Sequence, residues 1–399
     1  MKEAYIIDTV RTPVGKYGGI LSSVRPDDLL AHVIKALLKR NTSIDVNAIE
    51  DVIAGAANQA GEDNRNVARM AALLAGLPVT VAGNTVNRLC ASGLQAIMDG
   101  ARQIMCGDAE LIIAGGVESM TRAPFITAKS SAAFQRNPEI FDTTLGWRFI
   151  NKKLAEKYYP YSMGETAENV AEQWDISRKE QDEFALASQQ KYFNALAAGK
   201  WKEEIVPLIL TDAKGLQTIV DTDEPPRQTS LEKLADLKPV FVKEGGTVTA
   251  GNSSGINDGA AAMLLASEEA VKKYGLKPIA KVLSMAVAGV DPSIMGVGPV
   301  PATQKALQRA NLKIGDIDLI ELNEAFASQS LACINDLDLD INKVNVNGGA
   351  IAIGHPLGCS GVRISTTLLY EMKRRNAKYG LATMCIGVGQ GATVIFQSV

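Results

Sequence analysis

The stretch VNRLCASGL, residues 86–94, decides how the whole chain is interpreted. Just before it, β-branched side chains at 79–82 and 85–86 predict a strand, and from Leu94 onward apolar residues recur at helical spacing. Cys90 therefore lies on a strand-to-helix turn, where the partial positive charge of a helix N-terminus stabilises the nucleophilic thiolate. The alternative is a buried structural cysteine. A base, a second proton carrier and an oxyanion site elsewhere would favour catalysis.

The composition limits the class of protein. With 399 residues the chain exceeds one ordinary core, so we expect two or three modules. Apolar residues make up 46% and charged residues 21%, which is typical of a globular protein and not of a disordered one. The net charge of -3 provides no basic surface for nucleic acid.

The cysteines indicate the compartment. They are five in number, an odd count, and no two form a C-x-x-C pair, so we expect neither disulfides nor a metal site. Residues 4–7 already read as a strand, and we see no signal peptide, transit segment or long apolar run. We therefore predict a soluble cytoplasmic protein without a membrane partner. The cysteines are Cys90, Cys106, Cys333, Cys359 and Cys385.

Strands alternate with helices in the first third of the chain. Helices are expected at 26–39 and 66–75, and strands at 51–54 and 111–116. This alternation is typical of an α/β fold with mostly parallel sheets covered on both faces. His32 falls on the polar face of the first helix, so we expect it to be a solvated surface residue.

The character of the sequence changes at residues 121–246. This segment holds most aromatic residues, including all three tryptophans, with Lys/Arg clusters and few buried-strand runs. A capping box, Ser177 to Glu180, starts a long helix within it. We interpret the segment as an inserted domain. Strand and helix alternation is expected to resume at 247–250.

The second half of the chain echoes the first. The triplet 51–53 matches 318–320, and Ser-Gly at 92–93 matches Ser-Gly at 360–361 at nearly the same offset. Both Ser-Gly pairs precede a predicted helix. The matches indicate duplicated β/α units, although Ser-Gly alone is a common pair.

A second informative stretch is NVNGGAIAIGHPLG, residues 345–358. Pro356 biases His355 away from helical backbone, and the glycines allow close approach of a ligand. A histidine displayed there, beside a helix start, suits a general base, whereas the alternative is an ordinary loop histidine. With His32 set aside, His355 is the imidazole available to activate Cys90.

A third stretch, MCIGVGQG at 384–391, lies between two strand-like runs. A dinucleotide-binding loop does not fit, because no helix and no second strand with an acidic partner follow in the sequence. We predict a strand–turn–strand hairpin with Cys385 at its tip and an exposed Gly387 amide that can bind an oxyanion. The alternative for Cys385 is a buried strand cysteine.

A fourth motif, NEAF at 323–326, follows the predicted strand 319–322. Strand ends are where α/β proteins place their chemistry, and the Asn323 side chain can hold a water or an oxygen without titrating. Alone, this motif is weak.

These four motifs, together with TAGNSSG at 249–255, resemble those of thiolases in order and spacing over the whole chain. The resemblance implies conversion of a 3-oxoacyl-CoA and CoA into acetyl-CoA and a shortened acyl-CoA, with no permanently bound cofactor. It implies two duplicated β/α halves in five αβαβα layers and a homotetramer, or at least a dimer. The expected division is an N-terminal half at 1–120 completed by 247–273, an inserted CoA-binding loop domain at 121–246 and a C-terminal half at 274–399.

The resemblance also implies roles for five residues. The Cys90 thiolate attacks the 3-oxo carbon after His355 takes its proton. Cys385 carries a proton to and from the acetyl-CoA enolate, for which we expect a mildly depressed thiol pKa. His355 and a water held by Asn323 bind the enolate oxygen, and the amides of Cys90 and Gly387 bind the acyl-enzyme oxygen.

For CoA binding, the family pattern points to seven residues. One of them, Arg227, can stack on adenine or contact a phosphate, although a solvated loop charge is the alternative. Ser162 departs from the histidine that many acetoacetyl-CoA-forming thiolases carry, which disfavours a dedicated acetoacetyl-CoA synthase. The seven are Met163, Arg227, Phe241, Ala250, Ser254, Ala325 and Phe326.

Three further stretches, at 61–69, 141–149 and 295–299, look most like 3-oxoadipyl-CoA thiolases of aromatic catabolism. That substrate ends in a carboxylate, which a guanidinium can bind through two parallel hydrogen bonds. The candidates are Arg65, Arg69 and Arg148, with surface or interface ion pairs as the alternative role for each.

Other functions remain open at this point. An acetoacetyl-CoA thiolase or a general β-oxidation thiolase would share the same motifs. A decarboxylating ketoacyl synthase needs two histidines beside its cysteine, and His32 is not expected there. A non-catalytic acyl-CoA or lipid-binding module would have lost Cys90 or His355, and both are present. A cysteine hydrolase would form an acyl-enzyme that does not require CoA for release.

Overall fold

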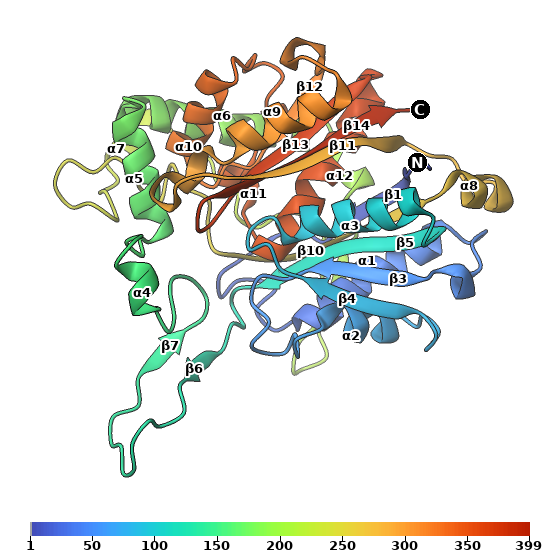
Figure 1. Ribbon diagram of the computed structural model, residues 1–399, viewed down its shortest axis with the longest axis horizontal. Helices are drawn as coiled ribbons and strands as arrows, with labels where there is room; N and C mark the ends of the chain where they lie inside the picture. The colour runs from blue at the N-terminus through green and yellow to red at the C-terminus, as the bar shows by residue number, and fades with distance from the viewer. Residues whose placement is uncertain (1) are drawn as a thin grey trace.

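The computed structural model describes residues 2–399. Most strands belong to one large sheet, and helices flank it on several sides (Figure 1). The strands are β1 (Tyr5–Arg11), β2 (Gly15–Lys16), β3 (Asp51–Gly55), β4 (Ala82–Val86), β5 (Leu111–Ser119), β6 (Phe125–Thr127), β7 (Ile140–Asp142), β8 (Leu208–Thr211), β9 (Gln217–Val220), β10 (Asn257–Ala266), β11 (Ala280–Gly289), β12 (Leu319–Leu322), β13 (Tyr379–Ile386) and β14 (Gln390–Ser398). The helices are α1 (Pro26–Arg40), α2 (Val67–Leu74), α3 (Ser92–Cys106), α4 (Lys152–Ala155), α5 (Met163–Gln173), α6 (Arg178–Ala197), α7 (Leu231–Ala235), α8 (Glu268–Tyr274), α9 (Pro299–Ala310), α10 (Ala327–Asp336), α11 (Ala350–Ile353) and α12 (Leu357–Arg375). Short 3₁₀ turns lie at Val46–Ala48, Lys200–Glu203, Pro292–Val297 and Ile314–Asp316.

The strand order shows two similar halves. The sheet runs β12-β13-β14-β11-β1-β10-β5-β3-β4, with β2 paired to β10. In the first half β1–β10 and β10–β5 are antiparallel and β5–β3 is parallel. In the second half β11–β14 and β14–β13 are antiparallel and β13–β12 is parallel. The halves join where Tyr5 and Ile6 pair with Lys281 and Ala280.

The prediction of mostly parallel sheets is wrong. Six of the nine pairings in the large sheet are antiparallel. Parallel neighbours need a crossover connection, usually a helix, such as α2 between β3 and β4. The strand β14 instead follows β13 through a tight turn and so pairs with it antiparallel.

Helices and sheets form five layers. Helices α1 and α2 cover the outer face of the first half in one hydrophobic cluster, and α9 and α10 belong to another on the outer face of the second half. Between the two halves lie α3 and α12, whose apolar side chains share the central cluster with β5, β10, β13 and β14. Figure 1 shows these central helices between the two parts of the sheet. The expected α/β fold with αβαβα layers is confirmed.

The two Ser-Gly echoes meet at the contact between the central helices. A Cβ on Gly93 would lie 2.6 Å from the carbonyl oxygen of Gly358, and one on Gly361 would lie 2.1 Å from the backbone nitrogen of Leu94. Real Cβ atoms do not approach backbone so closely, so glycine is required at both positions. The sequence echo therefore marks a place where the two halves pack backbone against backbone.

Two local predictions are wrong because distant parts of the chain intervene. Residues 247–250 form a loop and not a strand, since the amide of Thr247 donates to the Glu168 carboxylate; the next strand is β10. His32 is not a solvated surface residue but half-buried beside Val206 and Pro207, and burial lowers its pKa. Residues 79–81 also lie outside β4.

The segment between β5 and β10 is built differently from the halves. Its hairpin β6–β7 projects away from the layers at the lower left of Figure 1. The capping box predicted at Ser177 and Glu180 is confirmed at the start of α6. The division at 1–120, 121–246, 247–273 and 274–399 stays a prediction.

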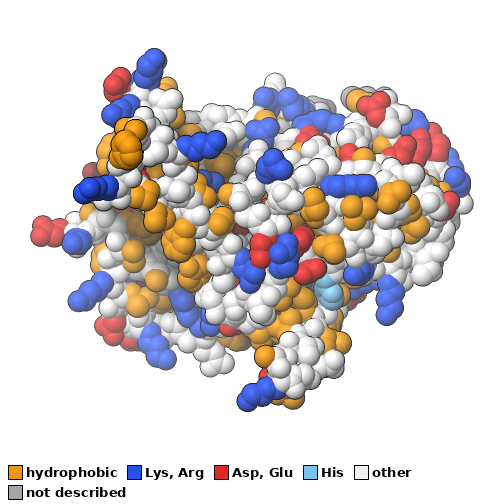
Figure 2. All heavy atoms as spheres, turned by 90° about the horizontal axis from the view of Figure 1, so that it is seen from below, with side chains coloured by type: hydrophobic (Ala, Val, Ile, Leu, Met, Phe, Trp, Pro, Cys, Tyr) orange, Lys and Arg blue, Asp and Glu red, His pale blue; other side chains and the backbone are white. Residues whose placement is uncertain are grey.

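The surface carries no continuous field of one charge on the face shown in Figure 2, where Lys and Arg are interspersed with Asp, Glu and hydrophobic patches. In the described part of the chain, every helix is too short or too polar to cross a membrane.

Candidate active site

Cys90 lies on a tight turn between β4 and α3, as expected. The Ser92 hydroxyl donates to the carbonyl of Leu89 at 2.6 Å and accepts from the amide of Arg88 at 2.9 Å, so one side chain closes the turn. Leu89 adopts a left-handed backbone with φ of 47°. That conformation is uncommon for a non-glycine residue and turns the chain sharply into the helix.

The environment of the Cys90 thiol has opposing effects on its pKa. The amides of Gly387 and of Cys90 itself favour the thiolate, but burial outweighs them and raises the pKa of Cys90. The expected thiolate is therefore not the resting form. A nucleophilic role for Cys90 would therefore require a base that removes its proton during attack.

His355 is buried and held from two sides. Its amide donates to Asn257 Oδ1 at 2.9 Å, and its Nδ1 lies 2.6 Å from Ser360 Oγ. The Ser360 hydroxyl donates its one proton to the carbonyl of Pro356 at 2.8 Å, so Ser360 accepts from Nδ1–H. This hydrogen bond assigns the tautomer in which Nε2 carries the lone pair, which is the form a general base needs.

The protonation of His355 is controlled by its surroundings. Burial and the nearby Arg363 lower the pKa of His355 to about 3. The imidazole is thus neutral at pH 7 and able to accept a proton, though an isolated imidazolium is costly there.

Asn323 lies at the end of β12 and faces His355. Its Nδ2 is 3.4 Å from both ring nitrogens of His355. Its backbone amide donates to the carbonyl of Thr383, which fixes it to β13. The structure therefore brings together the amide and the imidazole expected to share one oxyanion.

The predicted strand–turn–strand hairpin is confirmed, but Cys385 is not at its tip: it lies in β13, one residue before the strand ends, and pairs with Gly391, so the turn is formed by residues 387–389. Cys385 is buried, and burial together with the proximity of Cys90 and Cys333 raises its pKa well above the ordinary value. The expected mildly depressed pKa is wrong, because the sequence does not show how many apolar groups surround the thiol. Gly387 follows in the turn and is buried rather than exposed, with its amide directed to Cys90.

The CoA-binding candidates form a connected group. Met163, Ala325 and Phe326 share an apolar cluster with Cys385. Phe241 meets Phe326 edge-on, with ring centroids 6.5 Å apart. The Ser254 amide donates to the carbonyl of Ala325 at 3.0 Å, and Arg227 Nη2 donates to the carbonyl of Ala250 at 2.7 Å. Arg227 itself is exposed.

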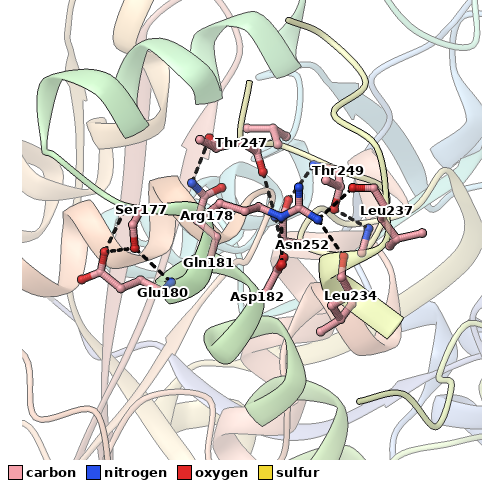
Figure 3. A network of polar contacts seen from close by, with 12 residues as sticks. Ser177, Arg178, Glu180, Gln181, Asp182, Leu234, Leu237, Thr247, Thr249 and Asn252 are labelled. Atoms are coloured by element: carbon pink, nitrogen blue, oxygen red, sulfur yellow. Dashed lines mark hydrogen bonds and ion pairs between the residues drawn. The ribbon is translucent and has the colours of Figure 1, made fainter. Parts of the chain in front are cut away.

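A polar network at the start of α6 holds the loop that carries Ala250 and Ser254 (Figure 3). Asp182 accepts from Arg178 Nε at 2.8 Å and from Asn252 Nδ2 at 2.9 Å. Arg178 also donates to the carbonyls of Leu234 and Leu237, which lie before Phe241. The network therefore positions two separate stretches of CoA-binding candidates relative to one helix.

A cavity of about 280 Å³ opens onto Cys90. Its wall includes Gly387, Leu357 at the start of α12, and the loop 143–148. Most of the lining side chains are apolar, which suits an acyl chain.

Sequence reasoning missed several residues that support the site. Ser360 is one of them, and the signal for it is a hydroxyl five residues after His355, one turn into the helix. Glu118 gave no signal: its buried carboxylate accepts amides of Ala57, Asn58 and Gly358. Burial raises the pKa of Glu118 to about 7.

Known proteins resemble this chain along its full length. Residues 4–269 match the family model "Thiolase, N-terminal domain" and residues 276–398 match "Thiolase, C-terminal domain". A 3-oxoadipyl-CoA/3-oxo-5,6-dehydrosuberyl-CoA thiolase of Escherichia coli (strain K12) is 56% identical, and a beta-ketoadipyl-CoA thiolase of Pseudomonas aeruginosa is 57% identical, each over 100% of both chains.

Solved structures agree with the fold. Acetyl-CoA acetyltransferase of Bacillus anthracis superposes with a TM-score of 0.94 at 42% identity, over 100% of this chain and 99% of the other. Human mitochondrial 3-ketoacyl-CoA thiolase in complex with CoA gives 0.92 at 42% identity, over 100% and 98%.

Proposed function

The chain belongs to the thiolase family, and on that premise we propose that it cleaves 3-oxoadipyl-CoA with CoA to give acetyl-CoA and succinyl-CoA, reversibly. The enzyme is an acyltransferase. The proposal is carried by full-length identity above one half to curated thiolases of that substrate. It is supported by two groups of contacts: the Gly387 amide and Cys385 lie next to Cys90, and Asn323 faces His355.

The first half-reaction forms the acyl-enzyme. His355 Nε2 takes the Cys90 proton as the sulfur attacks the 3-oxo carbon, and the amides of Cys90 and Gly387 stabilise the resulting oxyanion. The carbon–carbon bond then breaks, leaving a succinyl thioester on Cys90 and the enolate of acetyl-CoA. His355 and a water held by Asn323 stabilise the enolate oxygen, and Cys385 gives its proton to the enolate carbon.

The second half-reaction releases the acyl group. The CoA thiol transfers its proton to the Cys385 thiolate and attacks the thioester carbon, and Cys90 leaves as a thiolate that regains its proton from His355. Every proton and bond is thereby carried by named residues and substrate, so the mechanism uses no permanently bound cofactor.

The raised pKa values of the Cys90 and Cys385 thiols fit this order of reaction steps. A free thiolate at rest would react with other electrophiles, whereas a thiol that ionises only during attack is protected. The low pKa of His355 means that its imidazolium is not stable without a partner charge, so proton transfer and attack are coupled.

Assembly and location form a second part of the proposal. The hairpin β6–β7 exposes Phe125, Ile140 and, at its tip, Phe134, whose side chain is 98% exposed. Exposed apolar side chains on a projecting hairpin suit burial between copies of the chain, which supports assembly into a homotetramer or at least a dimer. Five free cysteines support a reducing compartment, the cytoplasm. Light scattering would test the assembly; a monomer would contradict it.

Thiolysis kinetics test the substrate. We expect kcat/KM to be higher for 3-oxoadipyl-CoA than for acetoacetyl-CoA or 3-oxohexanoyl-CoA. Mass spectrometry of the digested protein should locate a succinyl group on Cys90. Equal or lower values for 3-oxoadipyl-CoA would leave a general short-chain thiolase, and binding without turnover of any 3-oxoacyl-CoA would indicate a non-catalytic module.

A further inference from the structure

The Cys90 cavity contains one cationic and one anionic side chain among its lining residues. The cation is Arg148 and the anion is Glu118. Glu118 is already engaged by three backbone amides, which offset its charge. Within residues 2–399, Arg148 makes neither a hydrogen bond nor an ion pair, and it is half-buried. Its guanidinium donors are therefore free to bind an anion that enters the cavity.

The other two arginines suggested by the sequence do not reach this cavity. Arg69 donates to the carbonyls of Val79 and Val81, so its guanidinium is occupied in holding the chain before β4. Arg65 is exposed and is absent from the cavity wall. The structure thus separates three candidates that the sequence left equivalent.

The loop 143–148 is held at its first residue, Thr143, and at Trp147, next to Arg148. Trp147 Nε1 donates to the carbonyl of Tyr161 at 2.9 Å, which ties the loop to the chain entering α5. Thr143 accepts from Asn58 Nδ2 at 2.9 Å and donates to the carbonyl of Pro124 at 2.6 Å. A guanidinium on a held loop loses less entropy when it binds a ligand.

We propose that Arg148 binds the terminal carboxylate of the acyl group on Cys90 and thereby selects 3-oxoacyl-CoA substrates that end in a carboxylate. This inference rests on the proposed function. The succinyl group places its carboxylate at the far end of a short chain that leaves Cys90 through an apolar cavity. A guanidinium can hold that carboxylate through two parallel hydrogen bonds, whereas a methyl end leaves it unpaired.

Substitution of Arg148 separates this role from others. The full-length protein would be compared with Arg148→Gln, Arg148→Lys and, as a control away from the cavity, Arg65→Gln. The substrates are 3-oxoadipyl-CoA and 3-oxohexanoyl-CoA, which replaces the carboxylate by a methyl group. We expect the ratio of their kcat/KM values to fall by about 5–150-fold in Arg148→Gln, less in Arg148→Lys, and not at all in Arg65→Gln.

A second measurement shows whether the variants fold. Acylation of Cys90 by acetyl-CoA, which has no distal carboxylate, should proceed at the parent rate, and acylation by succinyl-CoA should slow in Arg148→Gln. An equal loss with both 3-oxoacyl substrates would mean that Arg148 contacts the CoA part and would overturn the proposal, as would an unchanged ratio. If the parent protein shows no preference for 3-oxoadipyl-CoA, the proposed function itself fails.

Discussion

The two halves of the molecule each direct a helix N-terminus at the same cavity, yet they supply different side chains to it. The first half contributes Cys90 on a strained turn before α3. The second contributes His355 before α12, Asn323 after β12 and Cys385 in β13. The shared strand order and the paired glycines give both halves one geometry. The repeated framework thus positions groups from both halves, and in the proposed mechanism the first half provides the nucleophile and the second half the proton carriers.

The largest expected loss of activity comes from replacing Cys90, the reactive residue of the first half. Cys90→Ala should lower thiolysis by roughly 10⁴-fold or more, because in the proposed mechanism Cys90 carries the acyl group. Intact mass after incubation with acetyl-CoA should show no added acetyl group. The matched control is Cys106→Ala, an exposed cysteine at the end of α3, which should keep full activity. Acylation of Cys385 in the parent protein would reverse the assigned roles.

Removing the proposed proton carrier of the second half, Cys385, should lower turnover less than removing Cys90 and should stop a different step. Cys385→Ala should still become acylated on Cys90 by acetyl-CoA. It should lose exchange of the acetyl α-hydrogens in deuterated water, and turnover should fall by roughly 10²–10⁴-fold. Retention of normal exchange would show that another group handles the carbon proton and that the division between the halves is not as described.

A smaller effect is expected from the residue that orients the base. Ser360→Ala removes the acceptor of His355 Nδ1–H, so the imidazole loses its preferred tautomer. We expect kcat to fall by about 5–15-fold with little change in KM. Ser365→Ala is the matched control, since this hydroxyl in the same helix donates to the carbonyl of Gly361. An equal loss in both variants would indicate helix destabilisation rather than a role at His355.

Local pattern was enough to predict much of this architecture. Periodicity on either side of Cys90 predicted the strand–turn–helix unit, and the echo around Gly93 and Gly361 predicted a relation between the halves. These features depend on neighbours in the sequence. The direction in which two strands pair does not depend on sequence neighbours alone. The sequence therefore does not predict the antiparallel placement of β10 and β14.

The sequence does not show which side chains become buried by residues that are remote in the chain. His32 looked solvated because the covering residues at 206–207 are remote in the chain. The thiol pKa of Cys385 was expected too low because its apolar neighbours come from several elements. Among the three candidate arginines, charge and spacing alone could not separate Arg148 from the others, whereas the cavity wall does.

The smallest expected effect concerns stability and compares a buried carboxyl in each half. Burial raises the pKa of Glu321, in β12, to about 8, and that of Glu118, in β5, to about 7. A carboxyl whose pKa is raised on folding binds more protons in the folded state, so its stabilisation is complete below the unfolded value near 4.5 and is lost as pH rises through 7 to 8.

Substitution by glutamine should separate the two carboxyls. Glu321 has a buried Oε2 without a hydrogen-bond partner in the described chain, so Glu321→Gln should remove its share of the pH dependence between pH 5 and 8 without loss at pH 5. Glu118→Gln should destabilise the protein by about 1 kcal/mol even at pH 5, because an amide offers one oxygen where the carboxyl oxygens of Glu118 accept three backbone amides. Urea unfolding of both variants at several pH values measures this. A Glu321→Gln curve with the same pH slope as the parent would show that Arg363 keeps the carboxylate ionised in the folded protein.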